Sequence, residues 1–209
     1  MTTQIKKINF VYLTALLFVL CSCLNKKTPS TQIAENKDFN EKMEKITELY
    51  NSGQYVEFIK AAEVELSESN KDFGFYLALS DAYGNLNNFE KAFYYARKQL
   101  EIKPSDYYTM LAIGNYHFVL EKLDSAEFYY NKVLEIQPTY ARANLNLAQL
   151  YEKQNKKDAA VEQYFKAIEL FKENNFNEEV ILYSKQILKL DPNNKLANEY
   201  LVPPYLKRD

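Results

Sequence analysis

The sequence is poor in the residue types on which most enzyme and metal sites depend. Its 209 residues include one histidine, two cysteines, four glycines and no tryptophan. Both cysteines, Cys21 and Cys23, lie at the start of the chain, so the residues from Leu24 to Asp209 cannot form a disulfide among themselves, and one histidine cannot complete a zinc site. The glycines stand alone, which excludes a glycine-rich phosphate loop. These are Gly53, Gly74, Gly84 and Gly114.

The charge balance excludes a further class of protein. The formal net charge is −2, and removing residues 1–22 would leave 24 basic against 28 acidic residues. A nucleic-acid-binding domain is expected to be strongly basic, so the pairs of adjacent tyrosines in the chain are interpreted as packing residues rather than as stacking platforms for bases. Eighteen tyrosines and thirteen phenylalanines, with few glycines, suit an all-α chain.

The first 22 residues have the pattern of an export signal. Lys6 and Lys7 precede a short apolar run, Ile8 to Leu20, which ends in Leu-Cys-Ser-Cys. As a helix this run would rise only about 20 Å, short of a hydrocarbon core of about 30 Å. The ending resembles a bacterial lipobox, which implies cleavage before Cys23 and a covalent lipid on that residue. An ordinary signal and an uncleaved anchor are the alternatives.

The segment after Cys23 is predicted to be a tether. Leu24 to Asp38 is polar and without periodicity, so residues 23–38 are expected to link the lipid flexibly to a domain, over roughly 20 Å. The residue after Cys23 is Leu24 and not the Asp that would suggest retention in the inner membrane. The protein is therefore expected in the cell envelope, anchored in the outer membrane and facing the periplasm. No cofactor is expected besides the lipid.

From Phe39 the chain repeats every 34 residues. The blocks are 39–72, 73–106, 107–140 and 141–174. From the second block on, the eighth position is small, the eleventh is aromatic and the twentieth is alanine. Small residues let two helices approach closely, and the proline near the block's end stops the second helix. The eighth position holds Ser80, Gly114 and Ala148, and the eleventh holds Tyr83, His117 and Tyr151. The twentieth holds Ala92, Ala126 and Ala160, and the prolines are Pro104 and Pro138.

This pattern resembles the tetratricopeptide repeat. The resemblance implies an all-α fold, a right-handed α-solenoid of tetratricopeptide-type helix pairs. The first block departs from the pattern, with Ile46 and Phe58 at the small positions, and is interpreted as a cap. Residues 175–209 are predicted to form either a degenerate fifth repeat or capping helices with a tail, and the sequence leaves that choice open.

In the resembled family, ligands lie against the second, fifth, ninth and twelfth positions of the first helices. Here these positions mix apolar and polar side chains, which suits an extended or helical peptide. The alternative is that some of the leucines pack between helices. The basic clamp of the family's chaperone-tail binders is absent. We call the resulting set the predicted ligand wall: Leu77, Asp81, Tyr108, Leu111, Asn115, Phe118, Arg142, Leu145 and Gln149.

No catalytic or metal-binding role is predicted for any residue. His117 takes the place of a core aromatic, and the carboxylates fall on solvated faces or helix starts. The expected function is a membrane-tethered interaction scaffold that binds a protein or peptide of an envelope complex, and neither nucleic acid nor a small-molecule substrate. The alternatives are an adaptor of a cell-wall enzyme, a self-associating module with the tail Val202–Asp209 in its own groove, and a surface nutrient-capture accessory.

Overall fold

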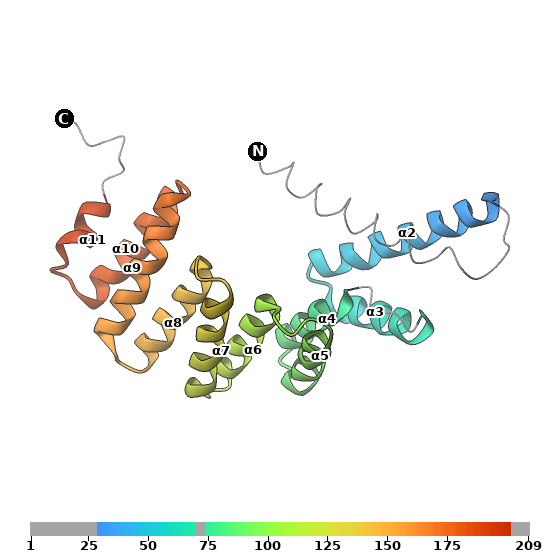
Figure 1. Ribbon diagram of the computed structural model, residues 1–209, viewed down its shortest axis with the longest axis horizontal. Coiled ribbons are helices and arrows are strands. Elements are labelled where there is room, and N and C mark those ends of the chain that lie inside the picture. The colour runs from blue at the N-terminus through green and yellow to red at the C-terminus, as the bar shows by residue number, and fades with distance from the viewer. Residues whose placement is uncertain (1–28, 70–73, 202–209) are drawn as a thin grey trace. The chain divides into compact units, whose positions relative to one another are not determined.

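A computed structural model describes residues 29–69 and 74–201 of the chain (Figure 1). The predicted export signal, the predicted lipidation site Cys23 and the tail Val202–Asp209 lie outside the described residues. Within the described part there are ten helices and no strands, which confirms the all-α prediction. None of the helices in that part combines the length and the apolar character that a membrane crossing requires.

The chain divides into two units between Glu48 and Leu49. Helix α2 spans Pro29–Asn51 and supplies the described part of the first unit. Because it starts at Pro29, the helix extends into residues 23–38, the segment predicted to be a flexible tether.

The second unit consists of helices that pack in chain order (Figure 1). The first helices of successive pairs are α4, α6 and α8, and each packs against the helix that precedes it and the helix that follows it. The bounds are α3 Tyr55–Ser69, α4 Phe75–Asn85, α5 Phe89–Ile102, α6 Tyr107–Val119, α7 Leu123–Ile136, α8 Ala141–Lys153, α9 Lys157–Glu173, α10 Asn177–Leu190 and α11 Lys195–Tyr200.

The turn inside each pair depends on one residue with positive φ. Asn87, Glu121 and Asn155 all have φ of 58°, and Gly53 at the same repeat position has φ of 75°. Glycine and asparagine tolerate this left-handed conformation at little cost, so three of the four turns carry a residue suited to it. Asn88 then starts α5, because its side chain accepts a hydrogen bond from the Lys91 backbone N–H at 3.2 Å.

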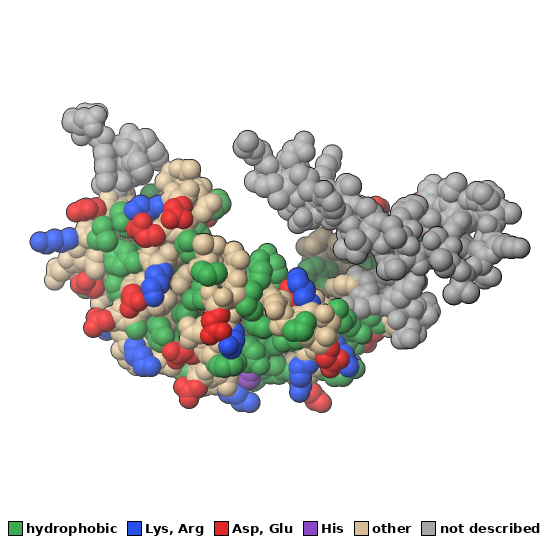
Figure 2. Space-filling model, in the orientation of Figure 1, with side chains coloured by type: hydrophobic (Ala, Val, Ile, Leu, Met, Phe, Trp, Pro, Cys, Tyr) green, Lys and Arg blue, Asp and Glu red, His purple; other side chains and the backbone are tan. Residues whose placement is uncertain are grey.

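The small residues of the repeat lie where the helices of a pair meet. Ala92, Ala126 and Ala160 are fully buried, and Ser80 Oγ donates to the carbonyl oxygen of Ala92 at 2.9 Å. Larger apolar side chains fill the space around these contacts. Hydrophobic side chains also reach the surface among charged ones, notably where α5, α6 and α7 lie (Figure 2).

The end of the described chain continues the same packing. Helix α10 packs against α9, and the short α11 packs against α10. Ser184 on α10 and Ala197 on α11 are both fully buried, as Ser80 and Ala92 are in the second block. The turn between α9 and α10 resembles the turns inside the earlier pairs, because Asn175 has φ of 59° and the Phe176 N–H donates to the Phe171 carbonyl at 2.9 Å. The turn before α11 resembles the junctions between pairs, because the Asn194 N–H donates to the Asp191 carbonyl as the Asp106 N–H does to that of Lys103. Helix α10 therefore takes the place of a second helix, and α11 that of a short first helix.

Candidate protein-binding surface

The nine residues of the predicted ligand wall lie on the first helices α4, α6 and α8, but they do not form one exposed surface. Leu111 and Leu145 are only 6% and 8% exposed and belong to two apolar core clusters. Phe118 is half-buried against the same cluster as Leu111. The fifth position of α6 and α8 is therefore a core position, which corrects the assignment of these two leucines to a ligand-binding wall.

Two polar residues of the predicted wall bind other side chains of the chain itself. Asp81 Oδ2 accepts hydrogen bonds from Tyr50 Oη at 2.8 Å and from Asn85 Nδ2 at 3.1 Å. Asn115 Oδ1 accepts from Tyr130 Oη at 3.0 Å and from Asn146 Nδ2 at 2.7 Å. Both oxygens connect neighbouring helix pairs, so replacing Asp81 or Asn115 would change the packing as well as any ligand contact.

The exposed members of the predicted wall are Tyr108, Arg142 and Gln149. Tyr108 belongs to a cluster of three rings, in which its centroid lies 4.2 Å from that of Tyr107 and 5.8 Å from that of Tyr140. Tyr107 and Tyr140 are themselves 5.2 Å apart. We call Tyr107, Tyr108 and Tyr140 the tyrosine cluster; Tyr107 and Tyr140 were not among the predicted ligand residues.

Two members of the tyrosine cluster, Tyr107 and Tyr140, have raised pKa values. A hydrogen bond with Tyr108, followed by burial, raises the pKa of Tyr107 to about 12. Burial also raises the pKa of Tyr140, and the positive charge of Arg142 opposes that rise. The cluster thus offers ring faces and hydroxyl groups beside a guanidinium. Tyr and Arg are the residue types most enriched where protein interfaces gain their affinity.

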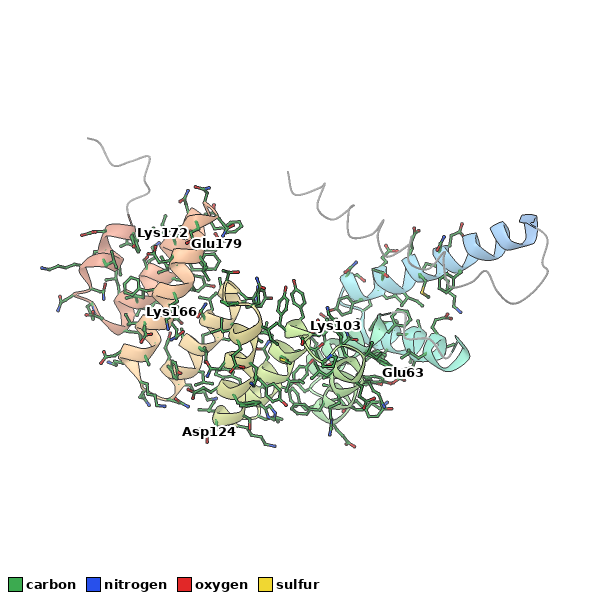
Figure 3. All side chains as sticks on the ribbon, viewed as in Figure 1. Glu63, Lys103, Asp124, Lys166, Lys172 and Glu179 are labelled. Carbon is green, nitrogen blue, oxygen red and sulfur yellow. The ribbon has the colours of Figure 1, made fainter. Side chains whose placement is uncertain are left out.

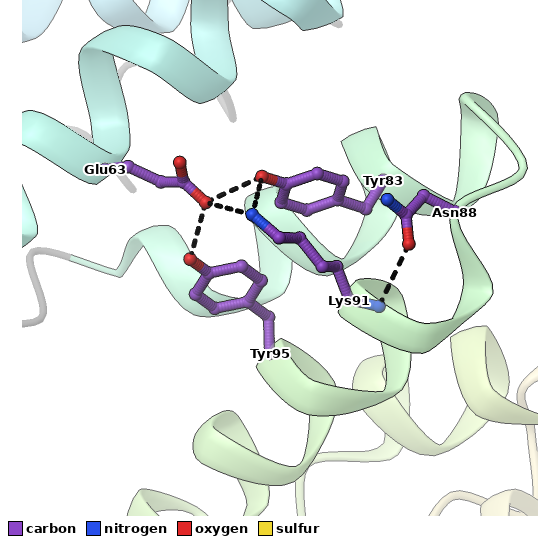
Figure 4. Close-up of polar contacts among 5 residues, drawn as sticks. All are labelled: Glu63, Tyr83, Asn88, Lys91 and Tyr95. Atoms are coloured by element: carbon purple, nitrogen blue, oxygen red, sulfur yellow. Dashed lines mark hydrogen bonds and ion pairs between the residues drawn. The ribbon is translucent and has the colours of Figure 1, made fainter.

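The other polar clusters of the second unit are structural. Glu63 on α3 accepts hydrogen bonds from Tyr83 Oη at 2.6 Å and from Tyr95 Oη at 2.7 Å, and pairs with Lys91 Nζ at 3.4 Å (Figures 3 and 4). Burial acts to raise the pKa of Glu63, but these donors outweigh it and lower that pKa. The aromatic residue at the eleventh position therefore joins one helix pair to the next. Tyr151 repeats the arrangement by donating to Glu127 Oε1 at 2.7 Å.

His117 packs among aromatic side chains, but it is half-buried and does not belong to the core. Its ring centroid lies 4.9 Å from that of Phe93 and 5.6 Å from that of Tyr129. Burial, and then the charge of Lys122, lower the pKa of His117 from its ordinary value of 6.5. In the part of the chain that the structure describes, no three His, Cys, Asp or Glu side chains come together in a way that could hold a metal ion.

Replacing His117 with phenylalanine is expected to reduce the acid sensitivity of the fold. Because the folded protein holds His117 at a lowered pKa, the unfolded chain binds the proton first as pH falls below the ordinary value. The free energy of unfolding therefore falls with acidification. Urea denaturation at about pH 7.5 and pH 5.5, which bracket the ordinary histidine pKa, should show a smaller loss for His117→Phe than for the wild type. Equal losses would contradict this explanation.

Comparisons with known proteins agree with the repeat pattern. Residues 73–106 and residues 120–176 each match a family model described as tetratricopeptide repeat. The first of these ranges coincides with the second predicted block. No curated protein matches the sequence significantly.

Solved structures share the fold at low sequence identity. MamA from Desulfovibrio magneticus RS-1 is 18% identical with a TM-score of 0.62, over 78% of this chain and 90% of that one. A thermophilic tetratricopeptide-repeat protein of Thermus thermophilus is 16% identical with a TM-score of 0.54, over 78% and 96% of the two chains. The C-terminal part of a repeat-containing protein from Cytophaga hutchinsonii is 22% identical with a TM-score of 0.53, over 73% and 69%.

These matches agree with the way the helices pack. The helices pack in consecutive pairs as a tetratricopeptide solenoid, and the repeat models account for α4, α5 and α7 to α9. Repeats of this kind serve as protein–protein interaction scaffolds. Residues 73–106 and 120–176 of this chain are therefore similar to tetratricopeptide repeats, in a fold of the same kind.

Proposed function

We propose that this chain is a lipid-tethered scaffold of the bacterial envelope, which holds a segment of a protein partner against the tyrosine cluster. The observation that carries the proposal is the exposed Tyr108, packed with Tyr107 and Tyr140 at the start of two successive first helices. The guanidinium of Arg142 acts on the same cluster. Exposed aromatic and cationic groups at one place are a basis for protein recognition.

The chemistry of this surface defines the segment that fits it. The rings bury apolar or proline side chains, and their hydroxyls bind backbone amides and carbonyls. Arg142 can bind a carboxylate through two parallel hydrogen bonds, in a bidentate pair. The side-chain amide of the exposed Gln149 adds a hydrogen-bond donor and an acceptor. We expect an extended segment with an acidic residue placed a short distance from an apolar or aromatic one.

The tether is proposed from the sequence. The basic start, the short apolar run and the Leu-Cys-Ser-Cys ending support lipidation of Cys23, and the following Leu24 supports the outer membrane. Lipidation would hold the binding surface near a membrane where its partner also resides. The regulatory adaptor of a cell-wall enzyme differs from this proposal only in the identity of the partner.

Capture of partners from membranes tests the binding surface. The double variant Tyr108→Ala/Arg142→Ala is expected to lose the envelope partner that the wild type retains after cross-linking. Both side chains are exposed, so folding should be preserved, which circular dichroism checks. Leu182→Ala, which shortens an exposed apolar side chain on α10, is the matched control and should retain the partner. Equal capture by both variants would remove the tyrosine cluster from the proposal.

The variant Cys23→Ser, taken through the same membrane preparation, tests the tether. This change is expected to move the protein from the membrane fraction to the soluble fraction and to abolish labelling with radioactive palmitate. A variant that stays membrane-bound and labelled would contradict lipidation at Cys23. If the captured partner is a peptidoglycan synthase or hydrolase, the chain is a regulatory adaptor of that enzyme.

A further inference from the structure

The last residues of the chain continue the repeat pattern beyond the described helices. Aligned on Pro138 and Pro192, residues 195–208 stand opposite residues 141–154, and five of the fourteen aligned residues are identical. These are Ala197, Asn198, Leu201, Tyr205 and Lys207, opposite Ala143, Asn144, Leu147, Tyr151 and Lys153. Tyr205 therefore occupies the eleventh position of a first helix, which is aromatic in each block from the second on.

Helix α11 supplies only the first half of such a first helix. It has six residues, whereas α6 and α8 have thirteen each. Ala197 is fully buried, as its equivalent Ala143 is, so this half packs as the earlier ones do. Tyr200 fixes the end of α11 to α9, because its hydroxyl donates to Glu169 Oε1 at 2.8 Å and accepts from Lys172 Nζ at 2.9 Å (Figure 3). The chain thus leaves α11 from a fixed point on the second unit.

The second half of a first helix covers the start of the preceding second helix. On α6, the ring centroid of Tyr116 lies 6.0 Å from that of Phe89 and 5.6 Å from that of Phe93, both near the start of α5. The turns before α5 and α10 and the prolines after them align with one another, so Asn177 and Ile181 are the equivalents of Phe89 and Phe93. Within residues 29–69 and 74–201, α10 has no counterpart of Tyr116, because α11 ends before the tenth position.

The start of α10 is apolar and open. Phe176, which precedes the helix, is 52% exposed, and its ring centroid lies 6.2 Å from that of Phe171. The residues at this position of the earlier turns are all polar: Gln54, Asn88, Lys122 and Lys156. Leu201, at the seventh position, is half-buried, whereas its equivalents Ile113 and Leu147 are 3% and 2% exposed. An exposed ring where the repeat is otherwise polar, and a core position left half open, indicate that a further segment covers this end.

We propose that residues 202–206 dock in an extended conformation on the start of α10 and close that end of the second unit. Pro203 and Pro204 cannot continue a helix, and each restricts the residue before it to extended backbone. Extended chain of this kind rises about 3.1 Å per residue, against about 1.5 Å in a helix. Tyr205 therefore reaches about 6 Å farther from Leu201 than a helical residue at the eleventh position would.

The reach of the tail matches the open surface. The added length brings Tyr205 from the level of Ile181 to that of Phe176, whose exposed ring it packs against edge to face. The two prolines then cover Ile181. Because Tyr205 is only four residues from Leu201, the tail is held at a high effective concentration beside this surface.

Charge favours the same arrangement. Glu178 and Glu179 occupy the first turn of α10, and Lys207 and Arg208 follow Tyr205 in the tail. Docking brings these opposite charges together at the rim of the apolar contact. The docked tail involves none of the residues of the predicted ligand wall, which stays open to a partner.

Tryptophan fluorescence tests the docking, because the chain contains no tryptophan of its own. In the full chain, Phe176→Trp is expected to emit at a shorter wavelength and to be quenched less by acrylamide than in the same chain lacking residues 202–209. Tyr205→Ala should expose the reporter as the deletion does. Leu182→Trp is the matched control, because Leu182 is 57% exposed on α10 and its equivalent Tyr94 stays 51% exposed beside a complete first helix. The fluorescence of this control should be the same with and without the tail.

Several results would overturn the docking. One is a Phe176→Trp reporter that responds neither to the deletion nor to Tyr205→Ala, with circular dichroism establishing that each variant keeps its helices. Protection that weakens on dilution would assign the surface to the tail of a second copy instead of the same chain. Protection that appears only when a captured partner is added would assign it to that partner. None of these results bears on the capture experiment at the tyrosine cluster, so the two proposals fail separately.

Discussion

Tyr130→Ala is expected to lower the free energy of unfolding by about 3–5 kcal/mol, the range for removing a large buried aromatic side chain. Tyr130 is 1% exposed and packs in the core cluster that contains Leu111 and Val133. Its hydroxyl donates to Asn115 Oδ1 at 3.0 Å. The substitution leaves a cavity between α6 and α7 and removes one of the two hydrogen bonds to Asn115. Urea denaturation followed by circular dichroism measures the loss.

Two further variants separate the causes of that loss. Tyr130→Phe keeps the ring and removes only the hydrogen bond, so about 1 kcal/mol is expected. Val119→Ala shortens an exposed side chain on α6 and should change the free energy by no more than about 0.5 kcal/mol. If Tyr130→Ala costs no more than Tyr130→Phe, the ring does not contribute the packing assigned to it.

The pairing of helices was predictable because it follows from short-range spacing. A small residue at the eighth and twentieth positions and a polar turn between them recur from the second block on, and each helix pair forms from contiguous residues. The turn conformation was not predicted, although its signal is in the sequence. Gly53, Asn87 and Asn155 occupy one repeat position, and two residue types that tolerate positive φ at the same position indicate such a turn.

The candidate site was predicted less well because it depends on how one pair stacks on the next. Leu77, Leu111 and Leu145 hold the same repeat position, yet Leu77 is half-buried and the other two belong to the core. The repeat pattern assigns them identical roles, and only the neighbouring pair decides their burial. Tyr107 and Tyr140 are 33 residues apart and meet because the starts of α6 and α8 come together.

The contact between pairs varies in a way that the single-repeat pattern does not describe. The twelfth position of one block meets the tenth position of the next. Gly84 faces Tyr116 in this way. The corresponding residues at the next junction are Phe118 and Leu150. At the first junction a small residue lies opposite a large one, and at the other junction both residues are of intermediate size. Both combinations fill the space between neighbouring helix pairs.

Gly84→Ala is expected to lower the free energy of unfolding by about 1–3 kcal/mol, as overpacking of a core does, even though alanine favours a helix by up to about 1 kcal/mol over glycine. A Cβ on residue 84 would lie 2.5 Å from Cε1 and 3.0 Å from Cζ of Tyr116. The Tyr116 ring is held by Phe93 and by a hydrogen bond between its hydroxyl and Ser80 Oγ at 3.0 Å. It therefore cannot move away without losing those contacts.

A double-mutant cycle with Tyr116→Leu identifies the cause. Leucine is the residue at the equivalent position 150, where it fits a junction whose twelfth position is Phe118. In the Tyr116→Leu background the added methyl group at residue 84 has room, and Ser80 keeps its bond to the Ala92 carbonyl. The two losses should be non-additive by about 1 kcal/mol or more, within the range for residues in contact. Strict additivity, measured by urea denaturation, would mean that Gly84 and Tyr116 are not coupled and that the junction is not set by their volumes.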